Sequence, residues 1–351
     1  MQTDANTLFA PRQGRILVVD DAPANIQAVT AILREHGYQI SVATNGRQAL
    51  SVVERVVPDL ILMDVLMPEM DGFEACRRIK HTPAYQHIPI IFLTSKTDAT
   101  DIVRGFELGA VDYVPKPFNA YELLARVNTH LTLDRLNREN EQLLLNVLPA
   151  SIAAELKQHP GIIAQRFEDV SVLFADIVGF TPLSARLSPA DLIEMLNRLF
   201  SRFDELADQH GLEKIKTIGD AYMVAGGLPE PRADHLEAMA SFALDMAATM
   251  QQVGAEEGLQ VRIGMNVGSV VAGVIGRRKF SYDVWGDTVN TASRLESHGE
   301  PGRINVSEPV YLRLRDTFDF EPRGMIDLKG KGPTSAYFLK ARLPAAAGHP
   351  G

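Results

Sequence analysis

The stretch EKIKTIGDAYM, residues 213–223, carries a lysine and an aspartate on the two sides of a glycine. Apolar and polar residues alternate before and after Gly219, which predicts a strand, a tight turn and a second strand. Asp220 can be an ordinary turn residue, because aspartate is favoured beside a turn glycine. Lys216 is harder to explain, because Ile215 and Ile218 indicate a half-buried sheet. Such a strand needs a chemical reason to keep an ammonium group beside a carboxylate.

The bulk properties indicate a globular protein of about two domains. The chain has 351 residues, 46% of them hydrophobic and 23% charged, and its net charge of -9 argues against broad affinity for nucleic acid. Its single cysteine, Cys76, excludes an internal disulfide and fits a reducing compartment. Residues 1–15 lack the order of a signal peptide, and no apolar run reaches the roughly 18 residues of a membrane span. We expect a soluble cytoplasmic protein with no membrane span and no nucleic-acid partner.

Residues 14–130 alternate short apolar runs with amphipathic helical segments. The runs are RILVVDD, QISVATNG, LILMDVLMP, PIIFLTS and DYVPKPF. Between the first two, residues 22–37 place apolar side chains on one helical face and end at Gly37. Five buried strands separated by helices predict an α/β doubly wound, parallel five-stranded sheet.

Polar residues follow four of these runs, at the sheet edge where such folds bind ligands. They are Asp20, Asp21, Asp64, Thr94 with Ser95, and Lys116. Each of them alone can be a loop residue or a helix cap. Together, three carboxylates repel one another unless cations lie among them. A hard divalent ion with oxygen ligands, together with the lysine, would satisfy them.

The motifs VVDD, LMDVLMPEMDG, LTS and KPF resemble the flavodoxin-like receiver domain of two-component response regulators. The resemblance implies that Asp64 is the phosphoacceptor, which takes a phosphoryl group from an upstream histidine kinase. It also implies one Mg²⁺ bound by the three aspartates, with Thr94 and Lys116 contacting the phosphoryl oxygens. Tyr113 stands where the family keeps an aromatic switch residue. An aspartyl phosphate adds charge and acceptor oxygens that can attract the threonine hydroxyl and the lysine.

Residues 131–168 continue the helical pattern without capping signals and are predicted to be a helical linker. The pattern fits heptads with these core residues: Leu133, Asn140 and Val147 at one position, Leu136 and Leu143 at the other. This predicts a short coiled coil with one polar core residue, a common device for setting register. The alternative is a single amphipathic helix docked on its own domain. Pro149 breaks or kinks the helix.

Strand and helix signals are mixed in residues 169–343. VSVLFADIVGFTPLS reads as a strand ending at Asp176, followed by a turn and a helix capped near Ser188. FSYDVWGDTVNTASRLESHG reads as a strand followed by a helix that opens at about Thr288. This order predicts an α+β, ferredoxin-like domain. Residues 1–13 and 344–351 are expected to be a flexible N-terminus and a tail.

Two pairs of polar residues in this domain suit a nucleotide. Asp176 and Asp220 each end an apolar strand beside a turn, so both can reach one Mg²⁺ completed by water and phosphates. By themselves they also fit two ordinary loop aspartates. Asn290 and Arg294 are i and i+4 on the predicted helix and therefore share a face, offering an amide for a sugar and a cation for phosphate.

Lys216 and Asp283 match the pairing edge of adenine. Adenine offers an acceptor at N1 and a donor at N6, so the lysine can donate to the first and the aspartate can accept from the second. Guanine presents the reverse pattern and would leave both charges badly matched. A base-reading role therefore explains the lysine of residues 213–223.

The motifs FADIVGFT, KIKTIGDAYM, YDVWGDTVNTASRLES and IDLKGKG resemble the class III nucleotide cyclases. The resemblance implies two metal ions, Mg²⁺ or Mn²⁺, on Asp176, Asp220 and the backbone of Ile177. It also implies that Lys216 and Asp283 are the adenine-selecting pair, where guanylyl cyclases typically carry Glu and Cys.

The remaining motif residues complete the implied site. Asn290 and Arg294 would orient the ribose and stabilise the transition state. In LKGKG, Lys329 would contact the triphosphate, with Lys331 as the alternative.

The two resemblances together imply an adenylyl cyclase that converts ATP to 3′,5′-cyclic AMP and is controlled by phosphotransfer to Asp64. The family's sites lie between two chains, which predicts a homodimer with two shared active sites. A guanylyl cyclase is one alternative. The other is a non-enzymatic response regulator whose second domain binds a nucleotide or a partner. No helix-turn-helix pattern or basic stripe indicates a DNA-binding output.

Overall fold

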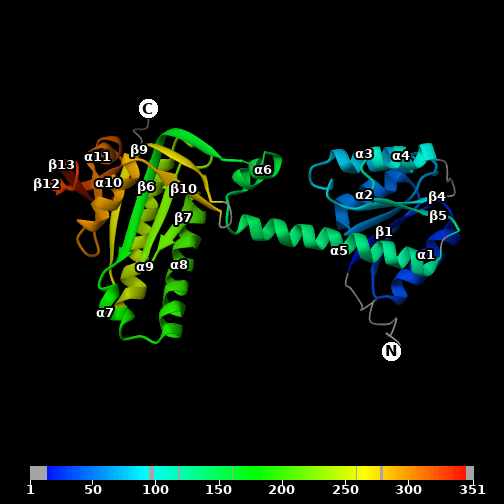
Figure 1. Ribbon diagram of the computed structural model, residues 1–351, viewed down its shortest axis with the longest axis horizontal. Coiled ribbons are helices and arrows are strands. Elements are labelled where there is room, and N and C mark those ends of the chain that lie inside the picture. The colour runs from blue at the N-terminus through cyan, green and yellow to red at the C-terminus, as the bar shows by residue number, and fades with distance from the viewer. Residues whose placement is uncertain are drawn as a thin grey trace. The chain divides into compact units, whose positions relative to one another are not determined.

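The computed structural model describes residues 14–94, 99–117, 119–159, 161–257, 259–276 and 280–344. The predicted N-terminus 1–13, the tail from residue 345, and the motif residues Ser95 and Phe118 lie outside the described residues. The chain divides into two compact units, Met1–Leu143 and Leu144–Gly351 (Figure 1). In the described part of the chain, no helix is both long enough and apolar enough to cross a membrane.

The first unit contains the predicted parallel sheet. Its strands are β1 (Arg15–Val19), β2 (Gln39–Ala43), β3 (Leu60–Asp64), β4 (Ile90–Thr94) and β5 (Asp112–Pro115). They lie in the order β2-β1-β3-β4-β5, and every neighbouring pair is parallel. The prediction of a doubly wound five-stranded sheet is confirmed. All residues of β3 and β4 are buried, because helices cover both faces of the sheet.

Five helices cover this sheet: α1 (Pro23–Glu35), α2 (Gly46–Val56), α3 (Gly72–His81), α4 (Ala99–Glu107) and α5 (Ala120–Leu145). Apolar residues of α1 and α5 pack on one face, and those of α2 and α3 pack on the other (Figure 1). Side-chain caps define two helix starts: Asn45 accepts from the amide of Gln48, and Asp71 from that of Glu74.

Helix α5 continues beyond the sheet and ends before Pro149. Only its first half is buried, and three of its later leucines are exposed by 47–64%: Leu133, Leu136 and Leu143. Val147 lies beyond the end of the helix, so the last predicted heptad position is wrong; its amide instead bonds to the carbonyl of Leu144 in a turn. Leu133, Leu136 and Leu143 are exposed and free to pack against a second helix, so the coiled coil stays a prediction.

The second unit is built on one mixed sheet. Its strands are β6 (Ala164–Ile177), β7 (Glu213–Ile218), β8 (Ala221–Gly226), β9 (Val261–Ile275), β10 (Ser281–Trp285), β11 (Ile304–Ser307), β12 (Phe318–Leu328) and β13 (Gly332–Arg342). They lie in the order β12-β13-β11-β9-β6-β8-β7, with β10 paired to β9. The described neighbours are antiparallel except β9 with β11. The strand–turn–strand prediction for residues 213–223 is confirmed, with Gly219 at φ 65° in the turn.

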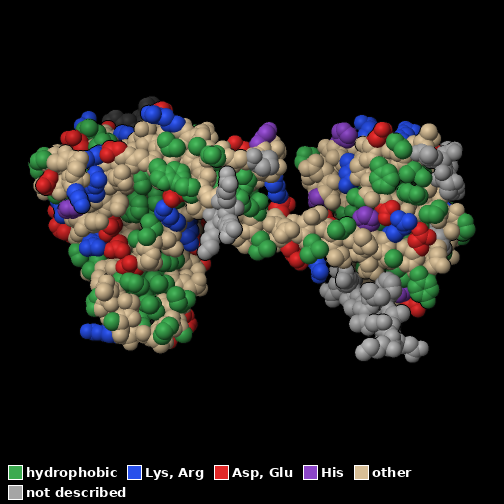
Figure 2. Space-filling model, in the orientation of Figure 1, with side chains coloured by type: hydrophobic (Ala, Val, Ile, Leu, Met, Phe, Trp, Pro, Cys, Tyr) green, Lys and Arg blue, Asp and Glu red, His purple; other side chains and the backbone are tan. Residues whose placement is uncertain are grey.

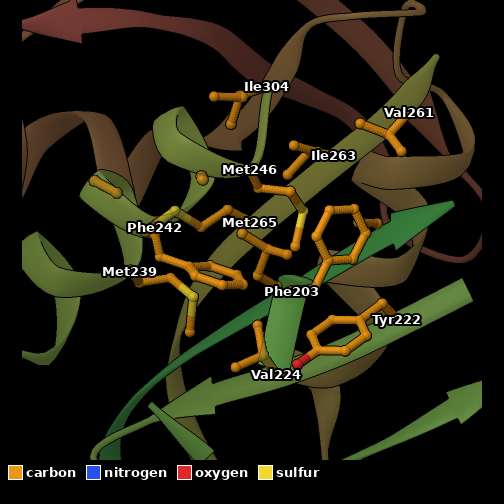
Figure 3. Packing of buried hydrophobic residues seen from close by; sticks show 14 of the residues in the cluster. Phe203, Tyr222, Val224, Met239, Phe242, Met246, Val261, Ile263, Met265 and Ile304 are labelled. Atoms are coloured by element: carbon orange, nitrogen blue, oxygen red, sulfur yellow. The ribbon is translucent and has the colours of Figure 1, made fainter. Parts of the chain in front are cut away.

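Helices lie on both faces of this sheet: α6 (Ala150–Gln158), α7 (Phe180–Ser184), α8 (Pro189–His210), α9 (His235–Glu257), α10 (Asp287–Ser297) and α11 (Glu308–Leu314). On one face, Phe203 of α8 and Phe242 of α9 pack against strand residues such as Met265 (Figure 3). On the other face, Ile152 of α6 and Ala292 of α10 are buried. The predicted cap at Ser188 is confirmed, because its hydroxyl accepts from the amide of Asp191 at 3.2 Å.

Candidate active site

The ends of β1, β3 and β5 bring the acidic residues of the first unit together with Lys116. The lysine Nζ donates to Oδ2 of Asp20 at 2.7 Å and to Oδ2 of Asp64 at 2.6 Å. Carboxylate oxygens of Asp20, Asp21 and Asp64 all lie within 4.8 Å of one another. The parallel register explains this, because the carboxyl ends of adjacent strands meet at one edge of the sheet.

The charges in this cluster do not balance. Burial raises the pKa of Asp64, and the charge of Asp20 raises it further, while Lys116 opposes both effects. Burial alone would lower the pKa of Lys116, but the two carboxylates raise it overall. Asp20 is fully buried and also accepts from the side-chain amide of Asn25 at 2.9 Å. Three carboxylates facing one ammonium fit a divalent cation with oxygen ligands.

Thr94 and Tyr113 lie on the neighbouring strands β4 and β5. The amide of Lys116 donates to the carbonyl oxygen of Thr94 at 2.7 Å, which ties the lysine loop to the end of β4. Thr94, Tyr113 and Phe106 line one pocket, and the tyrosine ring meets the phenylalanine ring edge-on with centroids 6.3 Å apart. Thr94, predicted to contact a phosphoryl group, and Tyr113, predicted to be a switch residue, are therefore neighbours in space.

In the second unit, strand register brings Asp176 and Asp220 together. Asp176 is paired with Ala221 of β8, so Asp220 in the preceding turn lies beside it. Burial raises the pKa of the Asp220 carboxyl, and the neighbouring charge of Asp176 adds to the rise. Ile177, the next predicted metal-binding position, is buried at the end of β6.

Arg262 is a residue of this site that the sequence analysis missed. It faces Asp176 across β6 and β9, and its Nη2 donates to Oδ2 of that aspartate at 2.7 Å. Its Nε lies 3.2 Å from Oε1 of Glu296 on α10. A charged residue inside the apolar run VRIGMNV was the available signal, because a cation in a buried strand needs a partner. One arginine contacts the carboxylates of Asp176 and Glu296, and Asp220 lies nearby, which leaves negative charge uncompensated. Asp176 and Asp220 therefore fit a divalent cation.

The lysine and aspartate predicted to read a base are in contact. Nζ of Lys216 on β7 lies 2.5 Å from Oδ2 of Asp283 on β10. The other oxygen of Asp283 accepts from the amide of Val284 at 2.8 Å, which fixes the orientation of the carboxylate. The aspartate side chain is 12% exposed and that of the lysine is 38% exposed, so the carboxylate is mostly buried while the ammonium group stays accessible to solvent.

Helix α10 and the β12–β13 turn carry the remaining predicted residues. Asn290 is exposed, and the guanidinium of Arg294 lies beside Gly330, Nη2 being 3.8 Å from the place that a Cβ would take. Lys331 is paired with Asp287 at 2.6 Å, whereas Lys329 is exposed and has no ion pair within the described ranges. Throughout the described residues, no side-chain bond joins Asn290 or Arg294 to Asp176 or Asp220. The residues thus form separate groups within one chain.

Two family models match the chain. Residues 162–341 match the adenylate and guanylate cyclase catalytic domain, and residues 16–128 match the response regulator receiver domain. The protein therefore belongs to the class III nucleotidyl cyclases and carries an N-terminal receiver domain.

Its relatives act on both purine nucleotides, judging by their names. An adenylate cyclase of Mycobacterium tuberculosis is 53% identical over 210 residues, covering 59% of this chain and 47% of that protein. The guanylate cyclase soluble subunit beta-2 of Rattus norvegicus is 40% identical over 228 residues, covering 64% of this chain and 33% of that protein. The crystal structure of the guanylate cyclase domain of RhGC from Catenaria anguillulae, in complex with GTP, is 38% identical. It covers 51% of this chain and 100% of that domain, with a TM-score of 0.50. The chain spans about half or less of the length of these curated relatives.

Proposed function

We propose that this protein is an adenylyl cyclase that converts ATP to 3′,5′-cyclic AMP and pyrophosphate. The observation that carries the proposal is the Lys216–Asp283 pair, an ammonium donor and a carboxylate acceptor 2.5 Å apart. N1 of adenine would accept from the lysine, and the N6 amino group would donate to the aspartate. The name of the Mycobacterium tuberculosis relative supports the same substrate.

The reaction is an in-line displacement at the α-phosphorus. The 3′ oxygen of ATP attacks this phosphorus, the bond to pyrophosphate breaks, and the hydroxyl proton passes to water. Asp176, Asp220 and the carbonyl of Ile177 would hold two Mg²⁺ or Mn²⁺ ions. When bound, such ions acidify the hydroxyl and neutralise phosphate charge.

Residues of α10 and of the β12–β13 turn complete the proposed mechanism. Arg294 neutralises charge that develops on the phosphoryl oxygens, and Asn290 orients the ribose. Lys329 is the better triphosphate ligand, because Lys331 is already paired with Asp287.

We further propose that the active sites are shared within a homodimer. An apolar patch flanks the base-reading pair: Ile218, Val271, Ile275 and Trp285, exposed by 39–56%. Val271 opposes Trp285, and Gly273 opposes Asp283, so the patch on β9 and β10 faces the same way as the base-reading carboxylate. Figure 2 shows hydrophobic side chains among charged ones on the face of the second unit that carries β7 and β10. Exposed apolar side chains beside an active site support burial against a second copy.

We propose that phosphorylation of the receiver domain, residues 14–130, controls the catalytic domain, residues 169–343. The Asp64 carboxylate, the two other aspartates of the cluster and Lys116 support phosphotransfer from a histidine kinase with one Mg²⁺ bound. Helix α5 runs from the first unit to Leu145 and offers a route for the signal. We place this protein in the cytoplasm, where its single cysteine would stay reduced.

The test is direct. Purified full-length protein is incubated with ATP or GTP and with Mg²⁺ or Mn²⁺, and the product is identified by mass spectrometry. Cyclic AMP as the main product supports the proposal. Cyclic GMP as the main product would identify a guanylyl cyclase instead. No cyclic product with any combination of nucleotide and metal would favour a non-enzymatic output domain.

A further inference from the structure

Arg262 is shared unequally between two carboxylates. Its Nη2 makes a hydrogen bond of 2.7 Å to Asp176, whereas its Nε and Oε1 of Glu296 are an ion pair at 3.2 Å. Both of these last atoms are buried and lack a well-directed hydrogen bond to any described group. The second oxygen of Glu296 accepts from the hydroxyl of Ser297 at 3.1 Å. Oε1 of Glu296 is therefore an acceptor that faces the guanidinium without being fully used by it.

The backbone of Glu296 is held close to the strand that carries Arg262, because α10 packs tightly against β9 at Gly264. A Cβ at Gly264 would collide with the backbone nitrogen of Glu296 and the carbonyl oxygen of Ala292, so only glycine permits this contact. The buried side-chain amide of Asn305 donates to the carbonyl of Leu295 at 2.8 Å and holds the same turn of the helix. The glutamate side chain is only 10% exposed. Its carboxyl group is thus held beside Arg262.

Binding of a divalent cation at Asp176 would take from the Arg262 guanidinium its carboxylate partner. The cation and the guanidinium compete for the same carboxylate, and two positive charges close together repel. The arginine side chain is 31% exposed, so a guanidinium released from Asp176 is only partly compensated by water. Glu296 offers it a second carboxylate beside the aspartate, on the guanidinium edge that carries Nε and Nη2.

We propose that Glu296 is a positioning residue: its carboxylate pairs with the Arg262 guanidinium when a divalent cation binds Asp176. The inference rests on the proposed role of Asp176 as a metal ligand. Before the cation binds, Arg262 compensates the charge of Asp176 and keeps its carboxylate in place. Afterwards, the glutamate keeps the arginine paired, so the cation can use the aspartate without leaving a half-buried cation unpaired.

The test measures Mn²⁺ binding by electron paramagnetic resonance of the free ion, on full-length protein without nucleotide. All proteins carry Asp21→Asn, which removes a ligand of the receiver cluster and leaves the cyclase site as the measured one. Glu296→Gln keeps the shape and removes the charge, and we expect the Mn²⁺ dissociation constant to rise at least fivefold. Glu296→Asp should recover part of the affinity. The matched control is Glu321→Gln, which breaks another arginine–glutamate pair of the same domain, Arg303–Glu321 at 2.7 Å, and should leave the constant unchanged.

A second measurement separates positioning from the direct attraction between Glu296 and the ion. In an Arg262→Gln background, Glu296→Gln should have no further effect on the Mn²⁺ dissociation constant, because the glutamate acts through the arginine. An effect of equal size with and without Arg262 would overturn the proposal, as would unchanged binding in folded Glu296→Gln alone. Asp176→Ala distinguishes the two levels of failure. If it leaves Mn²⁺ binding intact, the metal site itself is wrong; if it abolishes binding while Glu296→Gln has no effect, only the positioning role fails.

Discussion

Exchanging the proposed base-reading pair, Lys216 and Asp283, should change which nucleotide the enzyme uses. Lys216→Glu with Asp283→Cys places an acceptor where adenine needs a donor and removes the carboxylate that accepts from N6. Each mismatched hydrogen bond costs roughly 1–3 kcal/mol, because a buried polar group loses its partner. Two mismatches of roughly 1 kcal/mol or more each should lower ATP efficiency at least about thirtyfold, and the ratio of ATP to GTP efficiency by at least as much.

The two substitutions belong together for a structural reason. Lys216→Glu alone would put a second carboxylate near Asp283, whose side chain is 12% exposed, and two like charges close together destabilise the site. The neutral thiol of the double variant avoids this repulsion.

The assay is kcat/KM for ATP and for GTP with the same metal, on protein that is shown to be folded by its thermal melt. The matched control is Lys214→Glu with Asp204→Cys, the same exchange at a lysine–aspartate pair of 2.7 Å that starts on the same strand. The control should keep the ATP:GTP ratio of the parent. An unchanged ratio in the folded Lys216–Asp283 variant would refute base reading by these residues.

Three other outcomes follow from the structure. Beryllofluoride, which mimics a phosphoryl group, should change the cyclase rate of the parent and not that of Asp64→Asn; equal responses would exclude control through this aspartate. Asp176→Ala and Arg294→Ala, each inactive alone, should recover about a quarter of parental activity when refolded together at equal amounts, because random pairing makes half of the dimers mixed and each mixed dimer keeps one intact site. No recovery from confirmed mixed dimers would contradict shared sites. Burial, aided by Asp208, raises the pKa of Glu213 from 4.5 to about 7, so the folded state holds a proton that the unfolded state releases, and stability falls as pH rises through this window. Glu213→Gln should therefore raise the melting temperature at pH 8 and have little effect at pH 4.5; an equal change at both pH values would show that the carboxyl does not titrate in this way.

The sequence alone determined the class of both domains, because local patterns were strong. Short apolar runs ending in aspartate, threonine or lysine indicated a parallel sheet with a site at one edge, and the five strands confirm this arrangement. The turn at Gly219 could also be predicted, since a glycine between two alternating segments usually marks a turn. The ends of helices were harder to predict from the sequence. Helix α5 stops at Leu145, short of Val147 and Pro149, because the chain turns there to bury Leu148 in the second unit.

Only the tertiary structure decided which side chains touch. Lys216 and Asp283 are far apart in the chain, and their contact depends on how β7 and β10 lie in the folded sheet. Arg262 shows the limit most clearly: its partners are Asp176 across the β6–β9 register and Glu296 on a helix packed against Gly264. Local periodicity can mark a strand as buried, but it carries no information on register between strands or on how closely a helix approaches them. Those two quantities are set by the packing of the whole core, and they determine which charges are brought together.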